Sequence, residues 1–130
     1  MLDAVGDAAE GVETTLHYAD GLDTKKDKAF RLAYAKTFKL QPDVYAVQGY
    51  DAGQLLAAGL DAVKGNVADK AGVIKGMEAA KIDSPRGVWT LSKAHNPVQD
   101  MYLRKVVGKE NKSQGVAWKA LADPARGCKA

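Results

Sequence analysis

The sequence predicts an α/β fold that is rich in helix and has only a few strands. Much of its 46% hydrophobic content is alanine, which favours helix over strand. Apolar residues between 44 and 64 recur at helical spacing, whereas residues 12–18 and 101–107 alternate as strands do. At 130 residues the chain has the usual length of one domain.

The first third of the chain predicts a strand followed by a helix. Residues 2–9 belong to a helix that ends at Gly11, and the β-branched and aromatic residues of 12–18 form a strand. After a turn at 19–23, Thr24 is placed to cap a helix that extends to Phe38. One face of this helix is largely aromatic and apolar, with Phe30, Ala33, Tyr34, Thr37 and Phe38.

The longest predicted helix spans residues 44–64. Pro42 ends the preceding unit, Asp43 caps the new helix, and Gly65-Asn66 stops it. Its apolar stripe consists of Val44, Val47, Ala52, Leu55, Leu56, Leu60 and Val63. Asp69 caps a shorter helix that is expected to turn Val73, Ile74 and Met77 inward.

The last third predicts short strands separated by turns. The character of the sequence changes after 84–87. Strands are expected at 88–91, 101–107 and 115–119, with turns at 93–97 and 108–111. These strands are too few and too scattered to build a central parallel sheet. The apolar helix faces therefore need a further packing partner.

Composition and motifs exclude several functions. The net charge of +3 is small, and basic residues 25–31 are interleaved with aspartates, so no nucleic-acid partner is predicted. No apolar run is long enough to span a bilayer. The single cysteine, Cys128, can form neither an internal disulfide nor a zinc site.

Catalytic and metal sites are not predicted either. His17 and His95 lack neighbours at metal-ligand spacing, and no phosphate- or dinucleotide-binding glycine loop is present. No serine lies in a nucleophile-elbow context. The sequence thus predicts a protein that is not an enzyme and has no cofactor.

Four segments of the chain resemble, in order, the final portion of type 1 periplasmic solute-binding proteins. They are GDAAEGV (6–12), PDVYAVQGYDAGQLLAAGLDAV (42–63), IDSPRGVWTLSKAHNP (82–97) and DPARGC (123–128). The likeness is closest to the branched-chain amino acid receptors of ABC transporters. The N-terminus lacks the charged and apolar regions of a signal peptide, so a periplasmic location is implied by the resemblance alone.

The resemblance implies a partial type 1 fold, in which residues 1–130 are the C-terminal fragment of a two-lobe receptor. Residues 12–84 would supply a hinge strand and helices that pack on the first lobe's sheet. Residues 85–130 would return through the hinge and form the tail. The expected partners are a small-molecule ligand, an ABC permease and a second copy of the chain, which would complete the fold by oligomerisation or element exchange.

Tyr50 is the principal candidate for ligand binding, because the resemblance implies an aromatic side chain in the cleft near the start of this helix. Its ring suits an apolar or aromatic ligand, and its hydroxyl supplies a polar group. Packing under a neighbouring loop is the alternative for Tyr50.

Gln48 and Asp51 flank Tyr50. They are candidates for hydrogen bonds to the ligand or for ordering the hinge, and solvent exposure or local capping is the alternative for each. Gly49, Gly53 and Ala57 form a ridge that favours close packing.

The predicted function is the ligand-binding component of an ABC importer. Branched-chain or other hydrophobic amino acids and aromatic carboxylates are the two ligand classes that the resemblance leaves open. The alternative is a truncated, stand-alone chain with a structural or interaction role that binds no solute.

Overall fold

The computed structural model describes residues 2–127, so Cys128 lies outside the described residues. The chain begins with a short helix, α1 (Leu2–Val5), a 3-10 turn, η1 (Gly6–Ala9), and strand β1 (Glu13–Leu16). Three helices follow, namely α2 (Lys25–Phe38), α3 (Val44–Ala62) and α4 (Lys70–Ala79). Four strands complete the fold, namely β2 (Ile82–Ser84), β3 (Gly87–Leu91), β4 (Pro97–Val107) and β5 (Glu110–Leu121).

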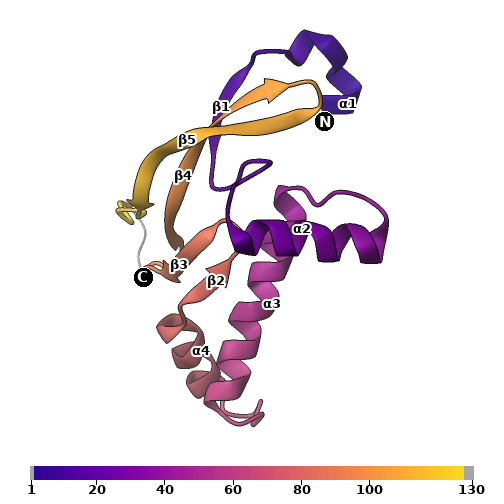
Figure 1. Ribbon diagram of the computed structural model, residues 1–130. Helices are drawn as coiled ribbons and strands as arrows, with labels where there is room; N and C mark the ends of the chain where they lie inside the picture. The colour runs from indigo at the N-terminus through magenta and orange to yellow at the C-terminus, as the bar shows by residue number, and fades with distance from the viewer. Residues whose placement is uncertain (1, 128–130) are drawn as a thin grey trace.

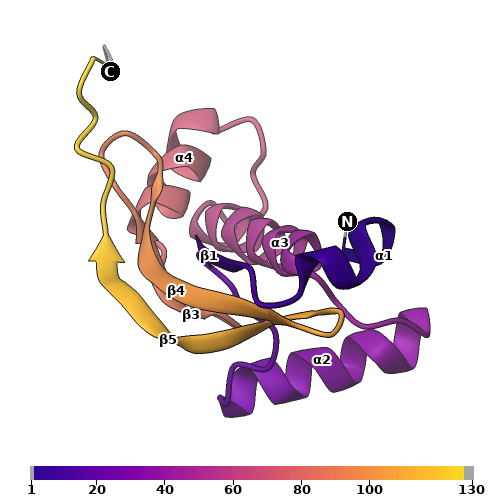
Figure 2. The same ribbon diagram turned by 90° about the horizontal axis from the view of Figure 1, so that it is seen from above.

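The five strands form one antiparallel sheet around β4. Its order is β1-β4-β3-β2, and β5 pairs with β4 on the other side. Strands β4 and β5 form a long, curved hairpin whose turn lies at the end of the molecule far from α4 (Figures 1 and 2). The predicted α/β class and the predicted partial type 1 fold are confirmed. The sheet is antiparallel, in agreement with the expectation that the scattered strands could not build a central parallel sheet.

The three predicted helix caps are confirmed. The backbone N–H of Asp27 donates to Thr24 Oγ1 (3.0 Å), and that of Ala46 donates to Asp43 Oδ1 (3.0 Å). The N–H of Gly72 donates to Asp69 Oδ1 (2.9 Å). Each bond satisfies a donor that the first helical turn would otherwise leave unpaired, so these boundaries are set by local chemistry.

The strands differ from the prediction in extent. Strand β2 was not predicted, and β4 begins at Pro97, inside the predicted turn at 93–97. Strand β5 has 12 residues where only 115–119 were expected. Backbone pairing with β4 extends it through the polar stretch 110–114, which carries no apolar alternation to indicate a strand.

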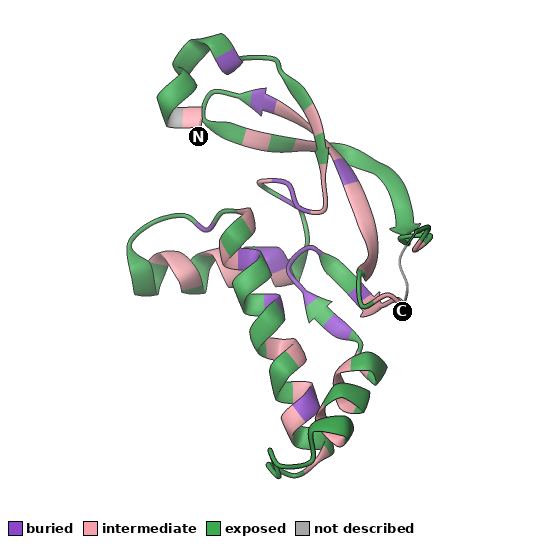
Figure 3. Cartoon of the chain, turned by 180° about the vertical axis from the view of Figure 1, so that it is seen from behind, coloured by how far each residue is buried: buried purple, intermediate pink, exposed green. Residues whose placement is uncertain are grey.

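The core lies where β1, the start of α2, α3 and β4 meet. Its buried members are Tyr18, Ala19, Leu22, Val47 and Tyr102, with Phe30 and Val44 packed against them. Outside this junction much of α3, α4 and β5 is exposed (Figure 3). The prediction that Ile74 points inward is wrong, since its side chain is exposed while Val73 and Met77 are half-buried.

Candidate functional site

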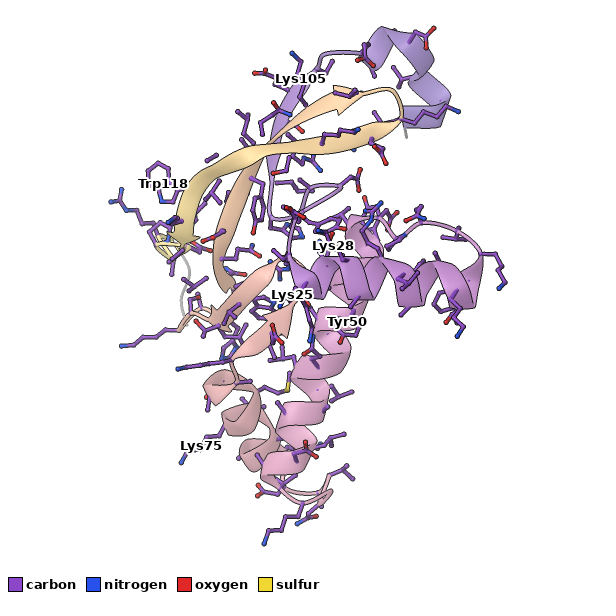
Figure 4. All side chains as sticks on the ribbon, viewed as in Figure 1. Lys25, Lys28, Tyr50, Lys75, Lys105 and Trp118 are labelled. Atoms are coloured by element: carbon purple, nitrogen blue, oxygen red, sulfur yellow. The ribbon has the colours of Figure 1, made fainter. Side chains whose placement is uncertain are left out.

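Tyr50 lies near the N-terminal end of α3, where this helix passes beside α2 (Figure 4). Its ring is tilted against Phe30 with centroids 5.1 Å apart, and the row continues along α2 through Tyr34 to Phe38. These four rings line an open groove of about 320 Å³ together with Ala33, Thr37 and Ala46. Tyr50 remains 41% exposed, so the groove presents aromatic surface to solvent.

Asp51 points the other way, into the interior. It is 2% exposed, and its Oδ2 accepts from Arg86 Nε at 2.6 Å and from Trp89 Nε1 at 3.0 Å. The alternative of solvent exposure or local capping is therefore wrong for Asp51. A buried carboxylate needs a charged partner, and Arg86 supplies it from a position 35 residues away.

The residues around Arg86 hold the β2–β3 turn against α3 and β4. Its guanidinium lies 5.0 Å from the centre of the Trp89 ring, and its backbone carbonyl accepts from Tyr102 Oη at 2.7 Å. The Arg86 N–H also donates to Ser84 Oγ at 3.2 Å. Through these contacts the Asp51–Arg86 pair joins α3 to three strands of the sheet.

Gln48 lies beside this network and contacts His17. Its Nε2 is 3.2 Å from His17 Nε2, just after β1. Burial, followed by the nearby positive charge of Arg86, lowers the pKa of His17 to about 4. The imidazole is therefore neutral near pH 7, and one of its nitrogens is free to accept a hydrogen bond.

A second polar cluster holds the start of α2. Asp27 is 0% exposed, and its Oδ1 accepts from Tyr18 Oη at 2.9 Å. Arg31 donates to the same hydroxyl (3.3 Å) and lies 3.6 Å from Asp20. Burial removes the carboxyl group from water and so raises the pKa of Asp27. Its other oxygen, Oδ2, has no hydrogen-bond partner within the described part of the chain.

A cavity of about 570 Å³ lies between the start of α3 and the β4–β5 turn. Arg31, Tyr45 and Arg104 line it. Both guanidiniums are engaged by the protein itself, Arg104 with Thr14 Oγ1 and the Tyr18 carbonyl, Arg31 with Tyr18 and Gln41. Neither guanidinium is therefore left without a partner and available for a ligand.

Sequence reasoning located the three candidate residues on one helix but could not separate their roles. Tyr50 and Gln48 lie at the surface, whereas Asp51 belongs to a buried network. That network also contains Arg86 and Trp89, which were missed because an arginine between Pro85 and Gly87 is typical of an exposed turn. Among residues 2–127, no group of His, Cys, Asp or Glu could hold a metal ion, and no helix is long and apolar enough to cross a bilayer.

Comparison with known protein families identifies the family of this chain. The family described as periplasmic binding protein matches residues 1–113, and the chain belongs to it. Members of this family act in ABC transport as solute-binding proteins. A search of curated proteins found no match.

Solved structures show the same fold in greater detail. A solute-binding protein of an ABC transporter from R. palustris, in complex with benzoate, is 48% identical and matches 98% of this chain with a TM-score of 0.91. A second, from Rhodopseudomonas palustris BisB5 with 3,4-dihydroxybenzoic acid, is 35% identical over 95% of this chain, with a TM-score of 0.83. A leucine-binding protein from Thermotoga maritima matches 88% of the chain with a TM-score of 0.74 but only 18% identity, which shows the fold alone.

The chain spans only about a third of these relatives. It covers 36% of the benzoate-bound protein, 35% of the dihydroxybenzoate-bound protein and 33% of the leucine-binding protein. This relation gives another explanation for the uncovered helix faces. In the relatives the same unit is part of a longer chain, and nothing in the comparisons supports the expected homo-oligomer.

Proposed function

We propose that this chain forms part of the periplasmic solute-binding component of an ABC importer for aromatic carboxylates. The observation that carries the proposal is the 48% identity, over 98% of the chain, to a protein solved with benzoate. The mechanism is closure of two lobes around the ligand, which presents a distinct closed form to the permease. It involves binding and conformational change without a catalytic step.

The geometry supports separate roles for the three candidate residues. Tyr50 offers an aromatic surface beside three other rings, in a groove whose volume suits a small aromatic molecule. Gln48 is exposed, and among residues 2–127 its amide oxygen accepts no hydrogen bond, so it can receive one from a polar group of the ligand. Asp51 acts indirectly, because its contacts with Arg86 and Trp89 hold the turn that leads into the hinge strands.

The test is a chimera in which residues 1–127 replace the matching segment of the benzoate-bound R. palustris protein. Calorimetric titration with benzoate should give saturable binding, and Tyr50→Ala should weaken it at least about tenfold, or ~1.4 kcal/mol. Leu32→Ala is the matched control, because Leu32 is exposed on α2 but lies outside the groove. This control should bind as the parent does.

The other outcomes separate the alternatives. Saturable binding of leucine, with none of benzoate, would assign the chain to a receptor for hydrophobic amino acids. A folded chimera that binds neither compound would contradict a solute-binding role and favour a structural or interaction role for this chain. A thermal-shift screen of the isolated chain shows in addition whether residues 1–130 bind benzoate or leucine without the rest of the two-lobe receptor.

A further inference from the structure

The described chain has two parts that face each other across a cavity (Figure 1). The hairpin part consists of α1, η1 and the β4–β5 turn with the strand ends beside it. The helical part consists of α2, α3, α4, β2 and β3. The cavity of about 570 Å³ is lined from both sides, for example by Asn111 after the turn and by Tyr45 on α3. Rotation of one part against the other therefore has space to close.

Each part is held together by its own polar contacts. In the hairpin part, Glu10 Oε2 accepts from the backbone N–H of Gly108 at 2.7 Å. In the helical part, Lys26 on α2 pairs with Asp83 on β2 at 3.0 Å, and the buried ion pair described above joins α3 to the β2–β3 turn. Contacts that cross between the two parts therefore set their relative placement.

Asp20, in the segment between β1 and α2, makes such a crossing contact. Its backbone N–H donates to the Asn111 carbonyl at 2.8 Å, and its Oδ2 accepts from the Asn111 N–H at 2.8 Å. Its carbonyl accepts from the N–H of Ser113 at 3.4 Å. The second carboxylate oxygen, Oδ1, lies 3.6 Å from Arg31 Nη1 on α2. Asp20 is thus bonded to the hairpin part and reaches the helical part by its charge.

The contact with Arg31 is the adjustable one. At 3.6 Å it is longer than the ~2.7–3.2 Å of N–H···O hydrogen bonds, whereas the contacts with Asn111 are tight. Arg31 also donates to Tyr18 Oη and Gln41 Oε1, so it keeps partners when it moves away from Asp20. The two charged side chains are only 18% and 21% exposed, so water screens them incompletely. Their attraction grows as they approach, which favours the placement that brings the two parts closest.

We infer that Asp20 and Arg31 form a latch between the hairpin part and the helical part, and that this latch favours the closed arrangement of the receptor. The inference rests on the proposed function, in which lobes containing these parts close around a ligand. Both are positioning residues, since they act through the hinge and not on the ligand. Ligand affinity should therefore follow the fraction of the receptor that is closed.

The experiment uses the chimera proposed above in a cysteine-free background. Spin labels are placed at Lys75→Cys on α4 (Figure 4) and at Val107→Cys beside the hairpin turn, both exposed positions. Pulsed electron paramagnetic resonance of the ligand-free protein should show more of the longer distances in Asp20→Asn, which keeps an acceptor for Asn111 but removes the charge. Its Kd for benzoate should rise about three- to fivefold.

Further variants separate the latch from a loss of folding. Arg31→Gln should act as Asp20→Asn does, and the double variant should be no worse than either single one, because all three remove the same pair. Arg31→Lys keeps the charge and should stay near the parent. Asp23→Asn is the matched control, since it removes an ion pair with Lys28 that does not reach the hairpin part. High salt should lengthen the distances in the parent and not in Asp20→Asn.

The latch is overturned by an unchanged distance distribution in Asp20→Asn, by additive effects in the double variant, or by an equal effect of Asp23→Asn. Because the distances are measured without ligand, the two proposals fail separately. A chimera that responds to Asp20→Asn but binds no benzoate keeps the latch and contradicts the proposed function. One that binds benzoate equally well with Asp20→Asn, at unchanged distances, keeps the proposed function and contradicts the latch.

Discussion

Helices α2 and α3 each bury one aspartate, and the two sites satisfy the carboxylate differently. Asp51 on α3 meets a guanidinium at 2.6 Å and an indole N–H at 3.0 Å. Asp27 on α2 meets only a tyrosine hydroxyl, at 2.9 Å. Each carboxylate has one oxygen that is buried without a hydrogen-bond partner among the described residues, Oδ2 of Asp27 and Oδ1 of Asp51. Arg31 donates to the tyrosine hydroxyl and not to the carboxylate.

The difference shows what each carboxylate contributes. Asp51 is held by an ion pair that also fixes the turn before β3, so the charge is required for the structure. Asp27 is desolvated with less compensation, and burial raises its pKa, so its neutral form is favoured by the fold. The same substitution, aspartate to asparagine, therefore has different consequences at the two positions.

The largest effect is expected from Asp51→Asn. It leaves Arg86 buried without a counter-charge and should lower the free energy of unfolding by about 3–5 kcal/mol, measured by urea denaturation. Replacing both residues, as Asp51→Leu with Arg86→Met, should recover much of the loss because no charge then remains buried. A loss below ~1 kcal/mol for the single variant would show that the pair is not the anchor of this turn.

A smaller effect is expected from His17, which lies beside the Asp51 network. Its pKa is lowered to about 4, so between pH 6.5 and 4 the unfolded chain binds a proton that the folded chain does not. Stability should therefore fall as the pH drops through this window. For a partly exposed ring we expect a contribution of about 1–2 kcal/mol.

His17→Gln keeps a hydrogen-bonding group near Gln48 and removes this titration. Denaturation curves at pH 7 and pH 4.5 should show a smaller loss for the variant than for the parent. In Arg86→Ala the pKa of His17, followed by NMR, should rise, because the Arg86 charge is one cause of its depression. Equal losses in the parent and in His17→Gln would contradict the assignment.

The smallest effect is expected from Asp27→Asn. The raised pKa means that the folded chain holds a proton above pH 3.8 that the unfolded chain has released, so the parent loses stability as the pH rises through this range. The variant should abolish that dependence and change the unfolding free energy near pH 7 by less than ~1 kcal/mol. A loss as large as that of Asp51→Asn would remove the distinction between the two sites.

Local signals predicted most of the helical part and little of the sheet. Thr24, Asp43 and Asp69 were placed as caps from sequence, because a cap bonds a backbone N–H only three residues away. The extent of β5 was not predicted, because its polar N-terminal half is held by pairing with β4 and not by burial of alternate side chains. The position of Tyr50 followed from family resemblance, and its neighbours on α2 were identified only as an aromatic face.

The sequence by itself determined the helices, their caps, the class of fold and the resemblance to solute-binding proteins. These depend on residues within a few positions of one another, or on segments that keep their order. Only the tertiary structure decided that Asp51 pairs with Arg86, that His17 stays neutral, and that Gly49 and Gly53 face open space. Each of these three features depends on which groups from distant parts of the sequence the fold brings together. Desolvation and charge pairing follow from that arrangement, so no local sequence pattern predicts them.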